Sequence, residues 1–206
     1  MSTQAELIID ARALITVGVT GRAPFLAGTM LIDMAEGVRI DCVYSYQKCS
    51  GLVQLLDGFI TSNGMAFSPD GQTMYLSYSH PSVQLIWAYD YKAQTGTPSN
   101  RPVFADMISL SGRADRAAVD ENDWHWICGN DAGLIHRFTP QGKLDRSLAV
   151  PVKKPAMCVF GGAGLETLFV TSTRPGGTNL SDQLLAGGVF ALHCGVRGLL
   201  DTACLH

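Results

Sequence analysis

Two polar residues, Asn63 and Asp115, are the first candidates for chemistry in this chain of 206 residues. Asn63 lies between Ser62 and Gly64, where an asparagine commonly bonds its own backbone in a turn. Asp115 lies in a segment flanked by glycine and arginine, which we expect to be a loop with a solvated or turn-capping carboxylate. Taken alone, the two residues do not specify a reaction.

Other reactive side chains are scattered along the chain. The six cysteines form no C-x-x-C pair, so we expect buried reduced thiols rather than a zinc cluster or a redox motif. No Cys-His or Ser-His-Asp arrangement has motif support, and no Gly-x-Gly-x-x-Gly run precedes a helix, which argues against a dinucleotide cofactor. His125 lies between two tryptophans, and strand alternation would turn it away from both. The pair Asn130 and Asp131 either lines a pocket mouth or, as we favour, forms a plain hairpin turn.

Composition narrows the class of protein. Hydrophobic residues make up 47% of the chain and charged residues 16%, and 22 glycines and 9 prolines punctuate it. This balance is typical of short buried strands joined by tight turns. The formal charge is -3 and no run of Lys or Arg occurs, so the sequence offers no basic surface for nucleic acid or for an anionic membrane. A small neutral or anionic metabolite is therefore the expected partner.

The apolar runs bear on where the protein is found. The longest of them, such as Leu165 to Val170, fall well short of the roughly 20 residues of a membrane-spanning helix. The first residues lack the basic start and the sustained apolar core of a signal peptide. We therefore expect no membrane segment and a cytoplasmic protein.

A repeat along the sequence predicts how the elements are arranged. One unit contains a strand, a Pro-Asp-Gly turn and two further strands over residues 64–90; related units begin near residues 117 and 157, and a weaker one near residue 25. Equivalent positions in the second strand are spaced by 49, 51 and 43 residues, namely Leu26, Tyr75, Trp126 and Phe169. Such a period is typical of four-stranded propeller blades. The sequence therefore predicts an all-β fold, a β-propeller with about four blades over residues 21–206, while residues 1–20 fit no blade and could be strand or helix.

One stretch carries a family resemblance. Residues 56–75 contain Ser62-Asn63-Gly64 before a strand, followed by a Ser-Pro-Asp-Gly turn at residues 68–71. One further match precedes this stretch, at residues 21–30. The others come after it in the expected order, within residues 87–101, 112–120, 155–162, 168–172 and 186–190. Over about residues 21–199 the chain resembles the SMP-30/gluconolactonase/regucalcin (LRE) family, whose members are six-bladed propellers that act as metal-dependent sugar lactonases.

The resemblance implies a metal site on the propeller axis. In the family, a divalent cation is held by a glutamate of the first blade, by the asparagine that matches Asn63 and by an aspartate that matches Asp115. Amide and carboxylate oxygens completed by waters suit Ca²⁺, Mg²⁺, Mn²⁺ or Zn²⁺. The cation would polarise the lactone carbonyl, and Asp115 would also accept a proton from the attacking water, which makes it the catalytic candidate. No substrate-binding residue is predicted.

The chain also departs from the family pattern. A counterpart of the first-blade glutamate is missing, and so is the Arg-x-Asn-Asp-Gly segment that contacts substrate in relatives. After the matching aspartate the family continues with glycine, whereas this chain has Arg116. This arginine could crowd the pocket, strain the turn or bind an anionic sugar group.

These observations lead us to expect a gluconolactonase-type hydrolase that opens an aldonolactone to its aldonic acid. Two alternatives stay open. The first is a catalytically impaired or non-catalytic calcium-binding propeller fragment, and the second is a lactonase for an arabino-, xylono- or sulfo-sugar lactone. Because an incomplete ring of blades would expose strand edges and apolar faces, self-association through blade edges is expected as well.

Overall fold

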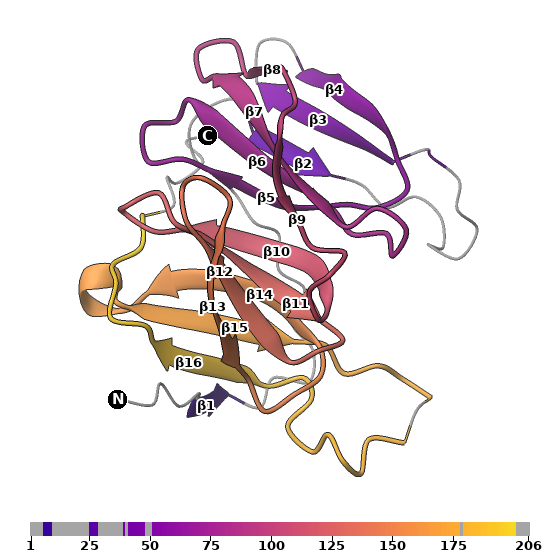
Figure 1. The fold of residues 1–206 in the computed structure, drawn as a ribbon, viewed down its shortest axis with the longest axis vertical. Helices are drawn as coiled ribbons and strands as arrows, with labels where there is room; N and C mark the ends of the chain where they lie inside the picture. The colour runs from indigo at the N-terminus through magenta and orange to yellow at the C-terminus, as the bar shows by residue number, and fades with distance from the viewer. Residues whose placement is uncertain are drawn as a thin grey trace.

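The chain forms four antiparallel sheets that follow one another along the sequence (Figure 1). The computed structural model describes residues 6–9, 25–28, 39, 41–47, 51–177 and 179–200. The first sheet contains β2 (Phe25–Gly28), β3 (Asp41–Gln47) and β4 (Gly51–Phe59). The second contains β5 (Ser62–Phe67), β6 (Thr73–Tyr78), β7 (Leu85–Lys92), β8 (Thr97–Ser99) and β9 (Val103–Asp106). The third contains β10 (Arg113–Val119), β11 (His125–Asn130), β12 (Leu134–Phe138) and β13 (Leu144–Ala149). The fourth contains β14 (Pro155–Gly161), β15 (Thr167–Ser172) and β16 (Val189–His193), and β1 (Glu6–Ile9) joins it.

The arrangement confirms the predicted all-β fold built of blade-like sheets. Tyr75, Trp126 and Phe169 each lie in the second strand of a sheet, as the repeat predicted. Leu26 lies in β2, and among the described residues no earlier strand belongs to that sheet. The outermost strands, such as β4 and β13, leave one side unpaired in the described part of the chain, and self-association through these edges stays a prediction.

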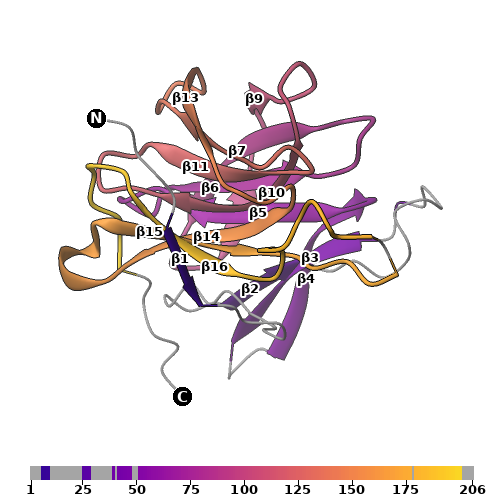
Figure 2. The same ribbon diagram turned by 90° about the horizontal axis from the view of Figure 1, so that it is seen from below.

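The beginning of the chain contributes to the fourth sheet. β1 pairs antiparallel with β16, with Glu6 opposite Ala191 and Leu7 opposite Phe190. Strand β1 therefore supplies the outer strand of a sheet whose other three strands come from the end of the chain (Figure 2). The predicted boundary at residue 20 stays a prediction, because most of residues 1–20 lie outside the described residues.

The Ser-Pro-Asp-Gly sequence forms the predicted turn between β5 and β6. The Ser68 hydroxyl donates to the Asp70 carboxylate over 2.6 Å, and the backbone N–H of Gly71 donates to the carbonyl of Ser68 over 2.9 Å. Gly71 has a φ of 69°, a conformation that glycine adopts without steric cost. The turn is thus specified by local side-chain bonding and returns the chain antiparallel into β6.

Strand β11 shows how neighbouring sheets cover each other. All six of its residues are buried, because both faces of the third sheet are covered. Trp126 packs in one core cluster with Cys158 and Phe160 of the fourth sheet, whereas His125 contacts the rings of Tyr75 and Phe104 in the second sheet. The predicted alternation around His125 is therefore confirmed.

A buried carboxylate organises the turn that leads into β11. Asp120 has no exposed surface, and its Oδ1 accepts hydrogen bonds from the backbone N–H groups of Asn122 and Trp124. Its Oδ2 accepts from Trp126 Nε1 over 3.0 Å and from the Arg137 guanidinium over 3.2 Å. The charge of Asp120 is thus compensated inside the sheet by four donors.

Two further expectations can be compared with the structure. The described cysteines, Cys42, Cys128, Cys158 and Cys194, are free and buried, which confirms the predicted reduced thiols at these positions; Cys49 and Cys204 lie outside the described residues. Within the described part of the chain, no helix has the length and apolar character needed to cross a membrane.

His125 makes the stability of this fold sensitive to acid. Neither ring nitrogen has a hydrogen-bond partner among the described residues, and burial lowers the pKa of His125 from 6.5 to about 3. Between these two values the unfolded chain binds a proton that the folded chain does not, so stability falls as the pH falls through this window. From pH 7 to about pH 4.5 this one residue should remove about 2–3 kcal/mol of unfolding free energy.

We predict that His125→Leu abolishes this contribution and, by removing two unsatisfied nitrogens, stabilises the protein by about 1–2 kcal/mol at pH 7. Urea unfolding of both proteins at pH 7 and about pH 4.5 measures the effect. His193→Gln, a change at an exposed histidine, is the control and should leave the pH dependence unaltered. An unchanged pH dependence in His125→Leu would contradict the prediction.

Candidate functional site

The candidate site lies where the first strands of three sheets run side by side. β10 contacts β5 on one side and β14 on the other (Figure 2). Near its beginning, each of these strands shifts register against the next strand of its sheet. The shifts lie between Asn63 and Ala66, between Ala114 and Ala117, and between Pro155 and Met157. Irregularities of this kind bend a strand and change the direction of its side chains.

Asn63 and Asp115 meet at these irregularities. The side-chain Nδ2 of Asn63 donates a hydrogen bond to Asp115 Oδ1 over 2.8 Å, although the two residues are 52 positions apart. The structure therefore brings together the two residues that the family resemblance selected. The predicted loop at Asp115 is wrong, because the residue lies in β10. There the strand bulges, since Asp115 and Arg116 together stand opposite the single residue Cys128 of β11.

Gly64 explains the close approach of the two strands. A Cβ atom at this position would lie 2.7 Å from the backbone oxygen of Asp115 and 2.3 Å from the Ser77 hydroxyl, and the residue has a φ of 53°. Both the space and the conformation therefore require glycine directly after Asn63. The short sequence Asn63-Gly64 supplies a polar side chain and, beside it, room for the neighbouring backbone.

Asn130 is a site residue for which the sequence analysis weighed a pocket-lining role but favoured a hairpin turn. It is the last residue of β11, only 7% exposed, and its Nδ2 donates to Asp115 Oδ2 over 2.7 Å and to the backbone oxygen of Pro155 over 3.2 Å. The predicted hairpin turn is correct for Asp131, which has a φ of 76°, and wrong for Asn130. A polar residue ending an otherwise buried strand was the available signal, since such a group must find a buried partner.

The cationic side chains around Asp115 differ in whether they form ion pairs. Arg113 and Lys154 both pair with Asp131, the first over 2.7 Å, so these two cations share one exposed carboxylate. Arg116 is exposed, and none of the ion pairs between described residues includes it. It therefore forms no close ion pair with a described carboxylate, although its charge still acts on Asp115.

Burial governs the acidity of Asp115. It raises the pKa of this carboxyl above the ordinary value of 3.8, while the hydrogen bonds from Asn130 and Asn63 and the charges of Arg116 and Arg113 oppose that rise. The net result is a carboxylate that binds a proton more readily than a solvated one. Both of its oxygens face amide nitrogens, which fixes the orientation of the group.

The donor set suits a hard divalent cation. Asp115 supplies carboxylate oxygens, and the Asn63 amide oxygen, which accepts a hydrogen bond from the backbone N–H of Gly64 over 3.0 Å, keeps a second lone pair that could bind an ion. The described residues include no group of three or more His, Cys, Asp or Glu side chains placed to hold a metal. An ion at Asp115 would therefore depend on amide, carbonyl or water oxygens as well.

Comparison with known proteins gives a consistent result. Residues 16–174 match the model of the SMP-30/gluconolactonase/LRE-like region. The chain is 34% identical over 166 residues to a 6-deoxy-6-sulfogluconolactonase of Pseudomonas putida, covering 80% of this chain and 54% of that protein. It is 31% identical over 179 residues to a regucalcin of Danio rerio, covering 85% of this chain and 60% of that protein. The chain thus spans less than two thirds of the length of these relatives.

A solved structure supports the fold. A regucalcin from Agrobacterium tumefaciens, described as a calcium-binding protein, superimposes with a TM-score of 0.83 at 23% identity, over 91% of this chain and 63% of that chain. The four sheets therefore correspond to part of a six-bladed β-propeller. Since the matching family model covers well over half of the sequence, this chain belongs to the SMP-30/gluconolactonase/LRE-like family.

Proposed function

We propose that this chain is a sugar-lactone hydrolase, which opens an aldonolactone to its aldonic acid. The observation that carries the proposal is the contact of Asp115 with Asn63 and Asn130, since it places a partly buried carboxylate of raised pKa between two orienting amides. The likeness to a sulfogluconolactonase and membership of a family that includes gluconolactonases support this reaction class.

In this proposal Asp115 is the general base. As the oxygen of a water molecule bonds to the carbonyl carbon of the lactone, the water proton passes to the Asp115 carboxylate. The bond between that carbon and the ring oxygen then breaks, and the proton is returned to the ring oxygen, which becomes a hydroxyl. The hydrogen bonds from Asn63 and Asn130 hold the carboxylate in one orientation throughout.

A divalent cation is part of the proposal, as the family resemblance implies. Asn63 and Asp115 are the residues that would hold it, and such an ion, when bound, would stabilise the negative charge that develops on the carbonyl oxygen. Ca²⁺, Mg²⁺, Mn²⁺ and Zn²⁺ all accept oxygen ligands of this kind.

The first prediction from this proposal concerns Asp115. We expect the protein to hydrolyse D-glucono-1,5-lactone above the spontaneous rate, with a divalent cation required, and Asp115→Asn to lower kcat by about 100-fold or more, because the amide cannot accept the proton. Titration of released acid against time, with each cation and with a chelator, measures the rate.

Asp131→Asn is the matched control, because it removes a nearby carboxylate that pairs with Arg113 and Lys154 but does not contact Asp115. This variant should retain activity within about threefold, and its circular dichroism and that of Asp115→Asn should match the unmodified protein. Absence of metal-stimulated hydrolysis for any lactone tested would favour a non-catalytic propeller and refute the proposal.

The second prediction concerns the choice of lactone. The unpaired charge of Arg116 beside Asp115 suits a substrate with an anionic substituent, and the likeness to an enzyme for a sulfonated lactone agrees with this. We expect Arg116→Gly to lower kcat/KM for 6-deoxy-6-sulfogluconolactone by about tenfold or more while leaving that for glucono-1,5-lactone within about threefold. Arg116→Lys, which keeps the charge, should retain most of the preference. Equal losses for both lactones would show that Arg116 does not select the anion.

A further inference from the structure

The positive charge of Arg116 lies directly beside the carboxylate of the candidate functional site. Arg116 follows Asp115 in the bulge of β10, where the two residues together stand opposite Cys128. It is exposed, and none of the ion pairs between described residues includes it. Its charge nevertheless acts on Asp115. A cation bound at Asp115 would therefore be repelled by Arg116.

The surroundings of Asp115 contain little negative charge to offset this repulsion. Within the described part of the chain, the charged groups that act on Asp115 are Arg116 and Arg113, both positive. The nearest other carboxylate in this network, that of Asp131, already pairs with Arg113 and Lys154. The affinity of oxygen sites for divalent cations depends on how many of their ligands are charged. The described donors should therefore hold a cation only weakly by themselves.

A negatively charged ligand group would change this balance. Next to Arg116 it would offset the positive charge that repels the cation, and the cation would attract the group in turn. The product of the proposed hydrolysis carries such a group, because opening the lactone leaves a carboxylate. Cation and anion would thus favour each other's binding, and thermodynamic linkage requires the two effects to be equal in size.

We propose that Arg116 makes cation binding at Asp115 conditional on an anionic ligand, so that the ion is held weakly alone and more tightly together with the anion. The inference rests on the proposed function, because it takes Asp115 as a ligand of the cation. It goes beyond that function, since it assigns to one exposed charge both the repulsion of the cation and the attraction of the anion.

Measurement of free Mn²⁺ by electron paramagnetic resonance tests the proposal on the full chain without catalysis. Mn²⁺ alone should bind with a Kd of about 1 mM. Saturating gluconate should lower this Kd about tenfold, whereas glucitol, in which a hydroxymethyl group replaces the carboxylate, should change it less than about twofold. Titrations without protein correct for the Mn²⁺ that gluconate binds in solution. Calorimetric titration of gluconate, with Mn²⁺ and with chelator, should give the same factor.

Variants of Arg116 separate an effect of charge from a merely structural one. In Arg116→Gln, Mn²⁺ alone should bind about threefold more tightly, because the repulsion is removed. The effect of gluconate on Mn²⁺ binding should fall below about threefold in the same variant. Arg116→Lys, which keeps the charge, should behave as the unmodified protein does. Asp115→Asn should bind Mn²⁺ at least about tenfold more weakly, since it removes the carboxylate ligand.

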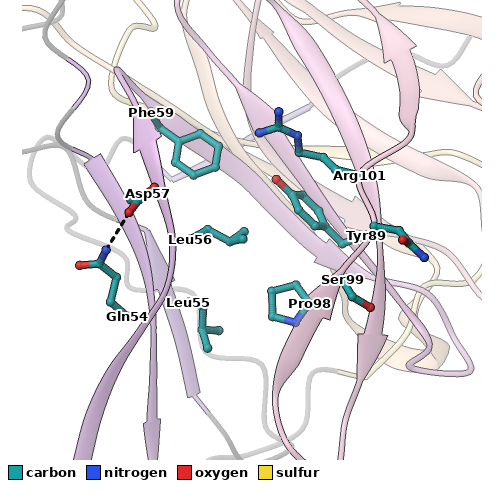
Figure 3. Close-up of a pocket in the computed structure, with 10 residues that line it drawn as sticks. Gln54, Leu55, Leu56, Asp57, Phe59, Tyr89, Pro98, Ser99 and Arg101 are labelled. Atoms are coloured by element: carbon teal, nitrogen blue, oxygen red, sulfur yellow. Dashed lines mark hydrogen bonds between the residues drawn. The ribbon is translucent and has the colours of Figure 1, made fainter.

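Arg101→Gln is the matched control. Arg101 is also an exposed arginine that none of the ion pairs between described residues includes. Figure 3 shows it near Tyr89 and Pro98, on the wall of a hollow between the first and second sheets that no residue of the candidate functional site lines. Its guanidinium carbon lies 4.6 Å from the centroid of the Trp87 ring. This variant should bind Mn²⁺, with and without gluconate, as the unmodified protein does.

Several results would overturn the proposal. Equal Mn²⁺ affinity with and without gluconate would do so and, if hydrolysis still requires a cation, would leave the proposed function intact. Unchanged or weaker binding of Mn²⁺ alone in Arg116→Gln would also contradict it, as would an equal gain in Arg101→Gln or unaltered Mn²⁺ affinity in Asp115→Asn. Absence of both Mn²⁺ binding and lactone hydrolysis would refute the proposed function as well.

Salt provides a measurement that needs no variant and decides if Arg116→Gln does not fold. In about 1 M KCl the Debye length is about 3 Å, so the charge of an exposed arginine is largely screened. The effect of gluconate on Mn²⁺ binding to the unmodified protein should then fall below about threefold. An effect that stays about tenfold at this salt concentration would show that Arg116 does not produce it.

Discussion

Hydrogen bonds at the Asp115 carboxylate and at its partner Asn130 connect three neighbouring sheets at the place where their first strands meet. Asn63 reaches it from the second sheet, and Asn130, which lies in the same sheet as Asp115, also donates to the Pro155 carbonyl in the fourth. In a partly buried setting such a network is favourable when its groups are satisfied and costly when one is removed. The relative position of the three sheets and the orientation of the proposed base therefore depend on the same few contacts.

The strand irregularities make this network possible. In a regular ladder, successive side chains alternate between the two faces of a sheet, and in the third sheet both faces are covered by neighbours. Strand β10 has one extra residue at Asp115 and Arg116, so the alternation of its side chains is interrupted at the proposed catalytic carboxylate. Gly64 contributes from the other side, since its missing side chain leaves room for the backbone of β10. Along each strand, the residues that pack in the core and those that form the site are thus only one or two positions apart.

The interior contains two very different buried polar arrangements. Asp120 is fully buried but receives hydrogen bonds from backbone N–H groups, Trp126 and Arg137, so its charge is compensated. His125, in the same sheet, is surrounded by aromatic rings and stays neutral because burial lowers its pKa. The first arrangement fixes a turn, whereas the second lowers stability in acid without any contact to Asp115. Stability and proposed chemistry can therefore be altered separately in this chain.

The sequence by itself determined the all-β fold, the period of the blades and the choice of Asn63 and Asp115, because turn residues, strand patterns and family motifs are local properties of the chain. It did not place Asn130 in the site, since the partner of a polar group at the end of a buried strand lies on another strand. It did not reveal that β1 joins β16, because this pairing connects segments far apart in sequence. Those contacts were decided only by the tertiary structure, in which the stacking of sheets determines which distant side chains meet.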